Sequence, residues 1–331
     1  MPGEMGGQKI MHLPGYQDIE RAHERIRPYI HRTPVMRSKG INEFFGGDFY
    51  FKCENLQKVG AFKFRGATNA VMALDEVQAK RGVVTHSSGN HAAALCLAAR
   101  MRGIPAYIAM PRTAPEIKKE AVRGYGGNIT FCEPTMESRE QAMEQIVAGT
   151  GAVFIPPYNH FDIVCGQGTA AKELIEESGR MDIILAPVGG GGLVSGTATS
   201  AGAMIPGVRT IAVEPAGADD AYRSLQAGHI IPSVKPVTIA DGLLTSLGDL
   251  TFAIIRERVH EIVRVSEEGI IRAMRMIWER MKIIVEPSGA VPFAAVVEDK
   301  IEYRGLRTGV ILSGGNVDLG KLPFSEAADR R

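Results

Sequence analysis

The sequence predicts an α/β protein with two open, mainly parallel sheets. Short apolar segments alternate with helical segments from about residue 65 to residue 160, and the alternation resumes from residue 181. This alternation is typical of parallel strands that are connected by helices. At 331 residues, of which 45% are hydrophobic, the chain is also long enough to form two packed domains.

The elements before residue 65 are predicted from spacing and from turn residues. Residues 1 to about 16 are rich in Gly, Pro and Met and lack periodicity, which predicts a loose arm. Apolar residues recur at helical spacing over residues 17–29, and Pro34 follows, so we expect a helix there. The aromatic segment 49–54 predicts a strand, with Lys63 in the loop after it.

The later elements alternate in type. Helices are expected over residues 67–74, 90–101, 116–125, 136–148 and 193–203. Strands are expected over residues 82–85, 105–110, 128–132, 152–155, 181–188, 208–213 and 308–312. A helix between two strands allows them to run parallel, so both halves of the chain predict a parallel sheet.

Composition excludes several classes of partner. The formal net charge is +1 and no basic run is interleaved with aromatic residues, so we expect no nucleic-acid partner. The cysteines form no CxxC pair and no basic-then-apolar leader is present, which predicts a reduced, cytoplasmic protein. No apolar run approaches the roughly 20 residues that cross a bilayer, so we expect no membrane partner.

The segment KVGAFKFRGA, residues 58–67, contains the first candidate for chemistry. Lys63 lies there between Phe62 and Phe64. A lysine amine is a nucleophile when it is neutral, and apolar neighbours disfavour its charged form. Lys63 is therefore a candidate for forming a Schiff base. The alternative is an ordinary surface lysine at the start of a helix.

Two turns between a strand and a helix are candidate anion sites. Residues 87–91, SSGNH, place backbone donors and hydroxyl groups at a helix N-terminus, where a carboxylate could bind, although such residues are also ordinary helix caps. Residues 189–192 are four glycines, which let backbone N–H groups approach a phosphate. Val194 and Ser195 occupy the places where a dinucleotide fingerprint needs glycine, and no GK[ST] follows. The phosphate should therefore belong to something smaller than a dinucleotide.

Two further segments follow predicted strands. Residues 214–220, EPAGADD, offer carboxylates and carbonyl groups of the kind that bind hard cations, although an acidic turn can also be merely solvated. Ser313 ends the last strand beside Gly314 and Gly315, where its hydroxyl group could meet a flat heterocycle.

Together these motifs resemble the fold type II pyridoxal-phosphate enzymes, which include the serine/threonine dehydratases and the serine racemases. The resemblance rests on KVGAFKFRGA, SSGNH, GGGGLVSG (189–196) and LSGGNVD (312–318), in that order, and extends from about Ile19 to Leu319. The segments EPAGADD, TIADGL (238–243) and WERMKIIVEPSGA (278–290) are most similar to the eukaryotic-type serine racemase branch. The implied fold is tryptophan synthase β-like, with the cofactor in the cleft between two domains.

The resemblance implies a role for each motif. Lys63 would form the Schiff base with pyridoxal 5'-phosphate, and Ser88 would act on the opposite face of the cofactor. The other cofactor contacts implied are Phe62, Asn90, Gly189, Gly190, Gly191, Gly192, Leu193 and Ser313. The implied substrate contacts are Ser87, Ser88, Gly89, Asn90 and His91. A divalent cation, Mg²⁺, Ca²⁺ or Mn²⁺, would bind Glu214, the carbonyl of Ala218, and Asp220.

The implied chemistry is elimination, because a serine at the pyridine nitrogen leaves that nitrogen largely neutral. L-Serine or L-threonine would give a 2-oxo acid and ammonia through an aminoacrylate. Ser88 could reprotonate Cα, so serine racemase activity is a further expectation. Tyr158 departs from the racemase branch, which tends to have asparagine there. Arg139 could bind a second substrate carboxylate, which keeps 3-hydroxyaspartate open as a substrate; alternatively it is a solvated helix arginine.

We therefore expect a large cofactor-binding domain formed by residues 1–71 and 159–331, with a small domain, residues 72–158, inserted between them. The leading function is a serine/threonine ammonia-lyase, followed by serine racemase and 3-hydroxyaspartate dehydratase. A non-catalytic small-molecule sensor on the same fold is the alternative from another class. The family resemblance implies a homodimer that binds a small amino acid.

Overall fold

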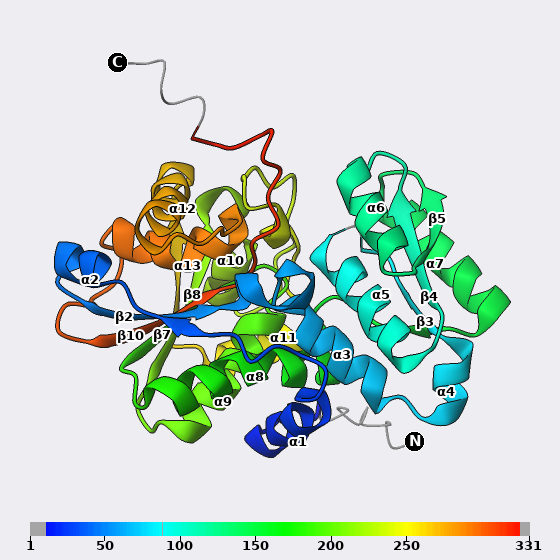
Figure 1. Cartoon of the computed structure of the whole chain (residues 1–331), viewed down its shortest axis with the longest axis horizontal. Coiled ribbons are helices and arrows are strands. Elements are labelled where there is room, and N and C mark those ends of the chain that lie inside the picture. The colour runs from blue at the N-terminus through cyan, green and yellow to red at the C-terminus, as the bar shows by residue number, and fades with distance from the viewer. Residues whose placement is uncertain (1–10, 88, 325–331) are drawn as a thin grey trace, which may run out of the picture.

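A computed structural model of the chain describes residues 11–87 and 89–324. These residues form two α/β regions, each built around its own sheet, and Figure 1 shows them as two lobes. We call them the large region and the small region, after the six-stranded and four-stranded sheets that they contain. The predicted α/β class with parallel sheets is confirmed.

The large sheet has the strand order β1-β2-β10-β7-β8-β9. Its strands are β1 (Val35–Met36), β2 (Asp48–Cys53), β7 (Ile183–Pro187), β8 (Arg209–Pro215), β9 (Glu261–Val265) and β10 (Arg307–Leu312). All neighbours pair in parallel except β1 and β2. Every residue of β7 is buried, because the sheet is covered on both faces.

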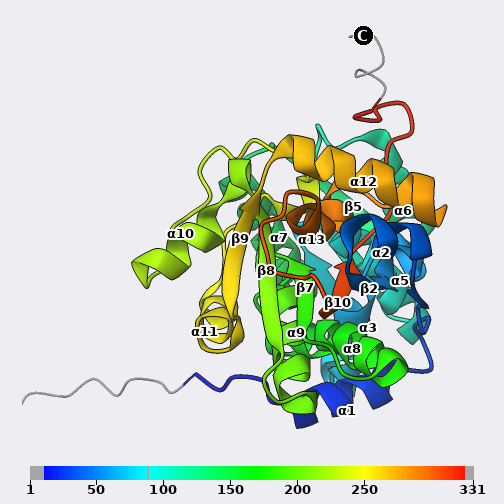
Figure 2. The same ribbon diagram turned by 90° about the vertical axis from the view of Figure 1, so that its left-hand side faces the viewer.

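Helices cover both faces of the large sheet, as Figure 2 shows. The helices of this region are α1 (Tyr16–Ile26), α2 (Lys39–Phe45), α8 (Phe161–Ser178), α9 (Gly192–Met204), α10 (Asp220–Ala227), α11 (Asp249–Arg258), α12 (Glu267–Met281) and α13 (Pro287–Val297). Helix α13 packs on one face, whereas α8 and α9 pack on the other. A Cβ atom added at Gly196 of α9 would lie 2.5 Å from the backbone N of Gly168 in α8, so glycine permits this close contact.

The small sheet has the order β5-β4-β3-β6 and is entirely parallel. Its strands are β3 (Val83–Thr85), β4 (Ala106–Pro111), β5 (Asn128–Cys132) and β6 (Val153–Phe154). The helices of this region are α4 (Glu76–Arg81), α5 (Asn90–Arg102), α6 (Glu116–Gly124) and α7 (Met136–Thr150). These strands lie within the predicted insertion, but its limits at residues 72 and 158 remain a prediction.

Helix α3 (Lys63–Ala73) lies between the two regions, where it contacts both α8 and α5 (Figure 1). The described residues also contain four short 3₁₀ turns: η1 (Glu54–Leu56), η2 (Lys58–Gly60), η3 (Ala216–Ala218) and η4 (Asp241–Leu243). The placement of Lys63 in a loop was wrong, because Lys63 is the first residue of α3.

Other expectations differ at element ends. Helix α1 stops at Ile26 rather than Tyr29, because Pro28 has no N–H group to continue the helix. The expected loose arm lies largely in residues 1–10, which are outside the described residues. Ser88 is also outside the described residues.

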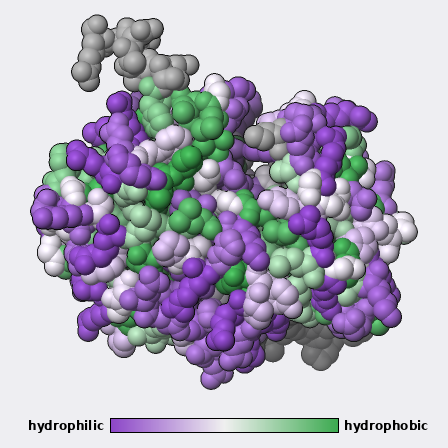
Figure 3. All heavy atoms as spheres, viewed as in Figure 1, coloured by the Kyte–Doolittle hydropathy of each residue, from purple (hydrophilic) through white to green (hydrophobic). Residues whose placement is uncertain are grey.

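The surface seen in Figure 3 is mostly polar, with an apolar patch toward the upper left of the view. Exposed apolar side chains of the chain include Leu319, at 67% exposure. Over the described ranges, no helix combines the length and apolar character that crossing a membrane requires. The cytoplasmic location and the homodimer remain predictions.

Candidate active site

The predicted site residues follow the carboxyl ends of parallel strands, where open α/β sheets bind ligands. The four-glycine loop follows β7, Ser313 follows β10, the acidic turn begins with the last two residues of β8, and SSGNH follows β3. Strands β7, β8 and β10 belong to the large sheet, whereas β3 belongs to the small one. The site must therefore be assembled between the two regions.

Lys63 has the properties expected of the reactive amine. Its Nζ donates a hydrogen bond to the carbonyl oxygen of Pro157 at 2.8 Å and lies 5.1 Å from the ring centroid of Phe62. Burial lowers the pKa of Lys63 to about 8, although the Glu286 carboxyl acts in the opposite direction. A substantial fraction of this amine is therefore neutral near physiological pH.

Lys58, the nearest rival lysine, is engaged elsewhere. Its Nζ donates to the carbonyl oxygen of Tyr29, and it lies 5.8 Å from the ring centroid of Phe64. Phe64 therefore flanks Lys58 rather than Lys63, in contrast to the environment expected from the sequence. Lys63 owes its shifted pKa to burial between the two regions.

Asn90 joins the two regions at this point. Its Nδ2 donates to both carboxylate oxygens of Glu286, at 3.1 and 3.3 Å, and its Oδ1 accepts from Nδ2 of Asn316 at 3.0 Å. The backbone N of Asn316 donates to Glu286 as well, at 3.0 Å. Asn90 begins α5 of the small region, whereas Glu286 precedes α13 of the large one.

Sequence reasoning missed Glu286 as a functional residue. It is 5% exposed, and burial, followed by the charge of Asp241, raises its pKa to about 7. A signal was present: the carboxylate follows the apolar run 283–285 and precedes Pro287, the first residue of a helix. A carboxylate at such a boundary lies at a helix N-terminus, where anions are favoured.

Two of the predicted substrate contacts in the SSGNH turn, Ser87 and His91, make hydrogen-bond contacts with the protein backbone. The Oγ atom of Ser87 accepts a hydrogen bond from the N of Gly89 at 3.4 Å. His91 is buried, and its Nε2 lies 3.0 Å from the carbonyl oxygen of Ile155. Burial, followed by the charge of Lys63, lowers the pKa of His91 to about 3, so its ring is neutral. His91 thus contributes packing and one backbone contact.

The glycine loop lies against the segment that holds Lys63. A Cβ atom added at Gly190 would come within 2.3 Å of the Tyr158 ring, and Gly191 has a φ of +86°. Glycine is therefore required at Gly190 because there is no room for a side chain, and it is favoured at Gly191 because the backbone is left-handed there. Tyr158 directly follows Pro157, whose carbonyl accepts from Lys63. The loop and the lysine are therefore brought together through residues 157–158.

The start of α9 offers free backbone donors beside this loop. Gly192 and Leu193 begin the helix, and the first amides of a helix have no intrahelical acceptor. The side chain of Leu193 is 4% exposed and belongs to the apolar core. Its predicted phosphate contact would therefore be made by the backbone.

Ser313 is placed next to the lysine segment. It is 2% exposed, and its carbonyl oxygen accepts a hydrogen bond from the N of Phe62 at 2.9 Å. An isolated bridge also pairs Ala61 with Gly314. The end of β10 is thus adjacent to the first residue of α3.

Arg139 lies on α7 of the small region, and its Nε is buried without a hydrogen-bond partner among the described residues. Burial lowers the pKa of His86; the charge of Arg139 acts in the same direction, whereas that of Glu140 opposes it. His86 directly precedes Ser87. The guanidinium group of Arg139 thus has an unused donor, and its charge acts on the residue that precedes the SSGNH turn.

The acidic turn contains one satisfied carboxylate and one unsatisfied carboxylate. Glu214 accepts hydrogen bonds at 2.9 Å from the N atoms of Ala221 and Tyr222. Asp220 is 1% exposed, and no hydrogen bond of good geometry reaches either of its carboxylate oxygens in the described part of the chain, although Ser233, Leu247 and the charge of Arg223 act to lower its pKa. Burial raises the pKa of Glu214 to about 8 and that of Asp220 to about 6. A cation would satisfy this carboxylate.

A metal site made of side chains alone is not found here. Residues 11–87 and 89–324 contain no group of three or more His, Cys, Asp or Glu that could hold an ion. The predicted ligand set includes the carbonyl of Ala218, which lies in η3 between the two carboxylates in sequence. The set of donors therefore remains a prediction.

The assembled residues fit pyridoxal 5'-phosphate. The site combines a lysine amine with a lowered pKa, a glycine loop that no side chain could replace, and a buried serine at the end of a neighbouring strand. An amine for the aldehyde, backbone amides for the phosphate and a hydroxyl for the ring are the groups that this cofactor requires.

Comparison with known proteins agrees with this fit. Residues 26–314 match the family described as pyridoxal-phosphate dependent enzyme. The chain is 51% identical over 315 residues to a beta-hydroxyaspartate dehydratase of Paracoccus denitrificans, covering 95% of this chain and 100% of that protein. It is 52% identical over 309 residues to a serine racemase of Arabidopsis thaliana, covering 92% and 93%.

A solved structure of serine racemase from Dictyostelium discoideum superimposes with a TM-score of 0.89 at 47% identity, covering 92% of this chain and 99% of that one. The chain therefore belongs to the family of pyridoxal-phosphate-dependent enzymes, among its lyases and racemases.

Proposed function

We propose that this enzyme converts a small β-hydroxy amino acid, L-serine or L-threonine, to a 2-oxo acid and ammonia, with Lys63 as the reactive amine. The β-hydroxyl group leaves as water, and one water is consumed when the product is hydrolysed to release ammonia. The single observation that supports this most directly is the state of Lys63: its pKa is lowered to about 8, and a backbone carbonyl is its hydrogen-bond partner at 2.8 Å. Bound pyridoxal phosphate supplies the electrophilic aldehyde and the electron sink for the reaction.

The residues of the chain divide the remaining tasks. Lys63, once released by the substrate amine, takes the Cα proton, for which a pKa near the working pH is favourable. The amides at the start of α9 hold the phosphate, and the SSGNH turn holds the substrate carboxylate. Ser313 is the group proposed to face the ring nitrogen.

A panel of substrates tests this proposal. Purified enzyme is incubated with L-serine, L-threonine and L-threo-3-hydroxyaspartate, and the 2-oxo acid, ammonia and D-enantiomer are measured separately. Formation of pyruvate and ammonia in equal amounts from L-serine is expected. If none of the three substrates yields a 2-oxo acid, the proposed elimination is wrong.

Dehydration of 3-hydroxyaspartate is a second candidate, and Arg139 is the observation that favours it. Its buried Nε lacks a hydrogen-bond partner among the described residues, and a second substrate carboxylate would provide one. Arg139→Gln should lower kcat/KM for 3-hydroxyaspartate by about 10- to 100-fold while changing that for L-serine by less than about threefold. Arg123→Gln, on exposed α6, is the matched control.

Serine racemisation is the third activity that we propose, with Ser88 as proton donor on the face opposite Lys63. Elimination needs a base on one face of the substrate, whereas inversion needs proton transfer on both faces. Ser88→Ala should therefore reduce D-serine formation much more than pyruvate formation. An equal loss of both would assign Ser88 another role.

We further propose that Mg²⁺, Ca²⁺ or Mn²⁺ binds Glu214, the carbonyl of Ala218, and Asp220. The unsatisfied carboxylate of Asp220 supports this proposal, because hard cations take oxygen ligands of this kind. Since the charge of Asp220 adds to the rise that burial causes in the pKa of Tyr158, the ion would act near the glycine loop. It would order that side of the site.

A further inference from the structure

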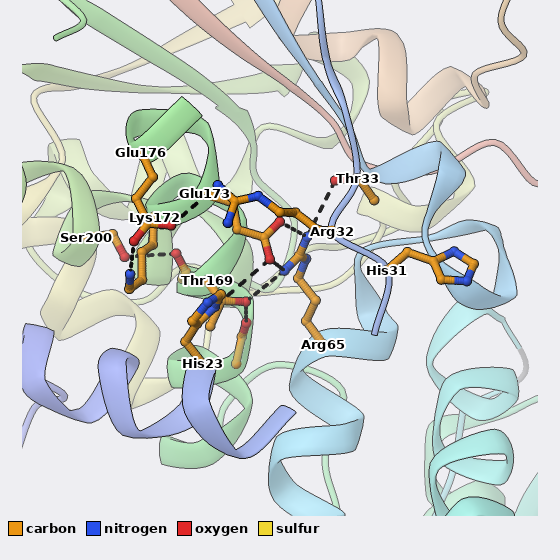
Figure 4. Close-up of polar contacts among 12 residues, drawn as sticks. His23, His31, Arg32, Thr33, Arg65, Thr169, Lys172, Glu173, Glu176 and Ser200 are labelled. Carbon is orange, nitrogen blue, oxygen red and sulfur yellow. Dashed lines mark hydrogen bonds and ion pairs between the residues drawn. The ribbon is translucent and has the colours of Figure 1, made fainter. Parts of the chain in front are cut away.

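Two residues after Lys63, Arg65 is completely buried and bound on two sides by carboxylates. Its Nε and Nη2 donate to Glu54 at 2.7 and 2.8 Å, and its Nη1 and Nη2 donate to Glu173 at 2.9 and 2.7 Å. Both contacts are therefore bidentate, the strongest geometry for an arginine. Figure 4 shows Arg65 reaching from α3 toward Glu173 and Thr169 of α8.

The cluster is balanced in charge. Lys52 donates to Glu173 at 2.7 Å, so two cations meet two carboxylates. Thr169 accepts from Nη1 of Arg65 at 3.1 Å. Burial alone would raise the pKa of Glu173, but Arg65 and Lys52 hold it at about 2. Burial likewise opposes the charge of Arg65, yet the carboxylates raise its pKa above the ordinary value.

The cluster joins three elements. Glu54 follows β2, Glu173 lies in the middle of α8, and Arg65 lies in the first turn of α3. Backbone contacts add to this connection. The N of Gly66 donates to Oε1 of Gln167 at 3.2 Å, and a Cβ atom added at Gly166 would lie 2.6 Å from the Cα of Gly66. The first turn of α3 is thus packed directly onto α8.

Lys63 and Arg65 lie on opposite sides of α3. Residues two apart in a helix are separated by about 200°, since each residue turns the helix by about 100°. Arg65 consequently faces Glu173 of α8, while Lys63 faces Pro157. The residue before the helix, Phe62, provides no side-chain cap. Its backbone N is bound to the carbonyl oxygen of Ser313, and the side chain of Arg65 binds the turn itself to α8.

We propose that Arg65 is a positioning residue, whose two bidentate contacts fix the first turn of α3 and so hold the Lys63 amine where the cofactor aldehyde binds. This inference rests on the proposed role of Lys63. Since the cluster is balanced in charge, Arg65 acts through geometry. Attack on a bound carbonyl depends strongly on the placement of the amine, so a small rotation of this turn reduces covalent attachment more than binding.

Arg65→Lys tests this proposal, because lysine keeps the charge but cannot make two bidentate contacts. Two probes are bound to the protein freed of cofactor. Pyridoxal 5'-phosphate forms a C=N bond between its aldehyde carbon and Nζ of Lys63, with loss of one water. 4-Deoxypyridoxine 5'-phosphate has the same ring and phosphate but no aldehyde. Arg65→Lys should raise the Kd of the aldehyde by at least about 10-fold and that of the analogue by less than about twofold.

Lys52→Met is the matched control. Lys52 belongs to the same cluster but lies on β2, so its loss should lower stability while leaving the ratio of the two Kd values unchanged. Thr169→Val removes one weaker contact of Arg65 and should raise the Kd of the aldehyde by about threefold. If Arg65→Lys does not fold, the two Kd values are compared in Thr169→Val instead, and an unchanged ratio there would overturn the proposal.

The outcomes separate this inference from the proposed function. Equal weakening of both probes in Arg65→Lys would mean that Arg65 supports the whole site, and the proposal would be wrong. Unchanged binding of both probes would also overturn it. If the unmodified protein binds the aldehyde no more tightly than the analogue, the proposed role of Lys63 fails instead.

Discussion

Lys63 and Arg65 are two cations in one turn of α3, yet their environments are opposite. Lys63 has no carboxylate within hydrogen-bonding distance in the described part of the chain, and burial lowers its pKa to about 8. Arg65 is bound by Glu54 and Glu173, which raise its pKa. A half-buried amine with no carboxylate in hydrogen-bond reach titrates near neutral pH and can react, whereas a fully paired, buried guanidinium group cannot.

The same contrast separates the carboxylates. Glu173 forms ion pairs with Arg65 and Lys52 and has a pKa of about 2. Asp220 forms no ion pair among the described residues and has a pKa of about 6. Glu286, which is hydrogen-bonded by amide groups alone, has a pKa of about 7. The pKa values of Lys63, Asp220 and Glu286 are all shifted toward neutral pH, as is common for groups in functional sites.

Replacing the unpaired cation should have the largest effect. Lys63→Ala should lower turnover by at least about 1,000-fold and remove the visible absorption of covalently bound cofactor, because no other described amine occupies its place. Absorption spectra and 2-oxo acid assays would measure this. Lys58→Ala is the control and should keep both properties. The opposite result would overturn the assignment of the site.

Replacing the paired cation should mainly affect stability. Arg65→Met leaves two buried carboxylates with one remaining cation, which should lower the free energy of unfolding by about 3–5 kcal/mol. Urea denaturation would measure the change. Arg275→Met, which breaks an exposed pair with Glu279, should cost less than about 1 kcal/mol. Equal costs for the two variants would remove the distinction drawn here.

Supplying a counter-charge to Asp220 should stabilise the protein. A cation at about 100 times its Kd adds about 2.7 kcal/mol, which thermal melting with and without chelator would detect. Protons compete for Glu214 and Asp220, whose pKa values are about 8 and about 6. The cation effect should therefore be greatest above about pH 8 and disappear below about pH 5.

Asp220→Asn should abolish this stabilisation. Asp219→Asn should retain it, because Asp219 is already paired with Arg223 and Arg264. A cation effect that survives Asp220→Asn would place the ion elsewhere.

The smallest effect concerns the pH dependence of Lys63. The rate of covalent cofactor attachment should rise about 10-fold between pH 7 and pH 9 and then level off, since a pKa of about 8 governs the neutral amine. Stopped-flow absorbance would follow the reaction. Glu286 favours the charged form of Lys63, so Glu286→Gln should shift the midpoint to lower pH. A rate still rising steeply above pH 10 would indicate an ordinary lysine.

Much of the fold was predictable because strand signals are local. The apolar runs near residues 183, 209 and 308 became β7, β8 and β10, and the four glycines connect a strand to a helix as expected. Helix α8 was not predicted. It is buried on nearly all sides and contains Gly166 and Gly168, so it lacks the one-sided apolar pattern that identifies a helix in a sequence.

Site residues that belong to one short sequence motif could be predicted. Contacts between residues that are far apart in the sequence could not. Lys63 and the glycine loop can be found in short segments. Arg65, however, pairs with Glu173 108 positions away, and Asn90 binds Glu286 196 positions away. In the sequence these charged residues look like surface residues, because only the folded chain provides their partners.

The position of β10 has a consequence for synthesis of the chain. Strand β2 pairs only with β1 and β10 among the described strands, and β10 is translated after every other strand. The small sheet can assemble on the ribosome from strands that emerge early. The edge of β2 that pairs with β10 stays without its partner strand until β10 has been synthesised. A chain released before Arg307 would hold β1-β2 and β7-β8-β9 as two separate pieces. The last strand to leave the ribosome joins them.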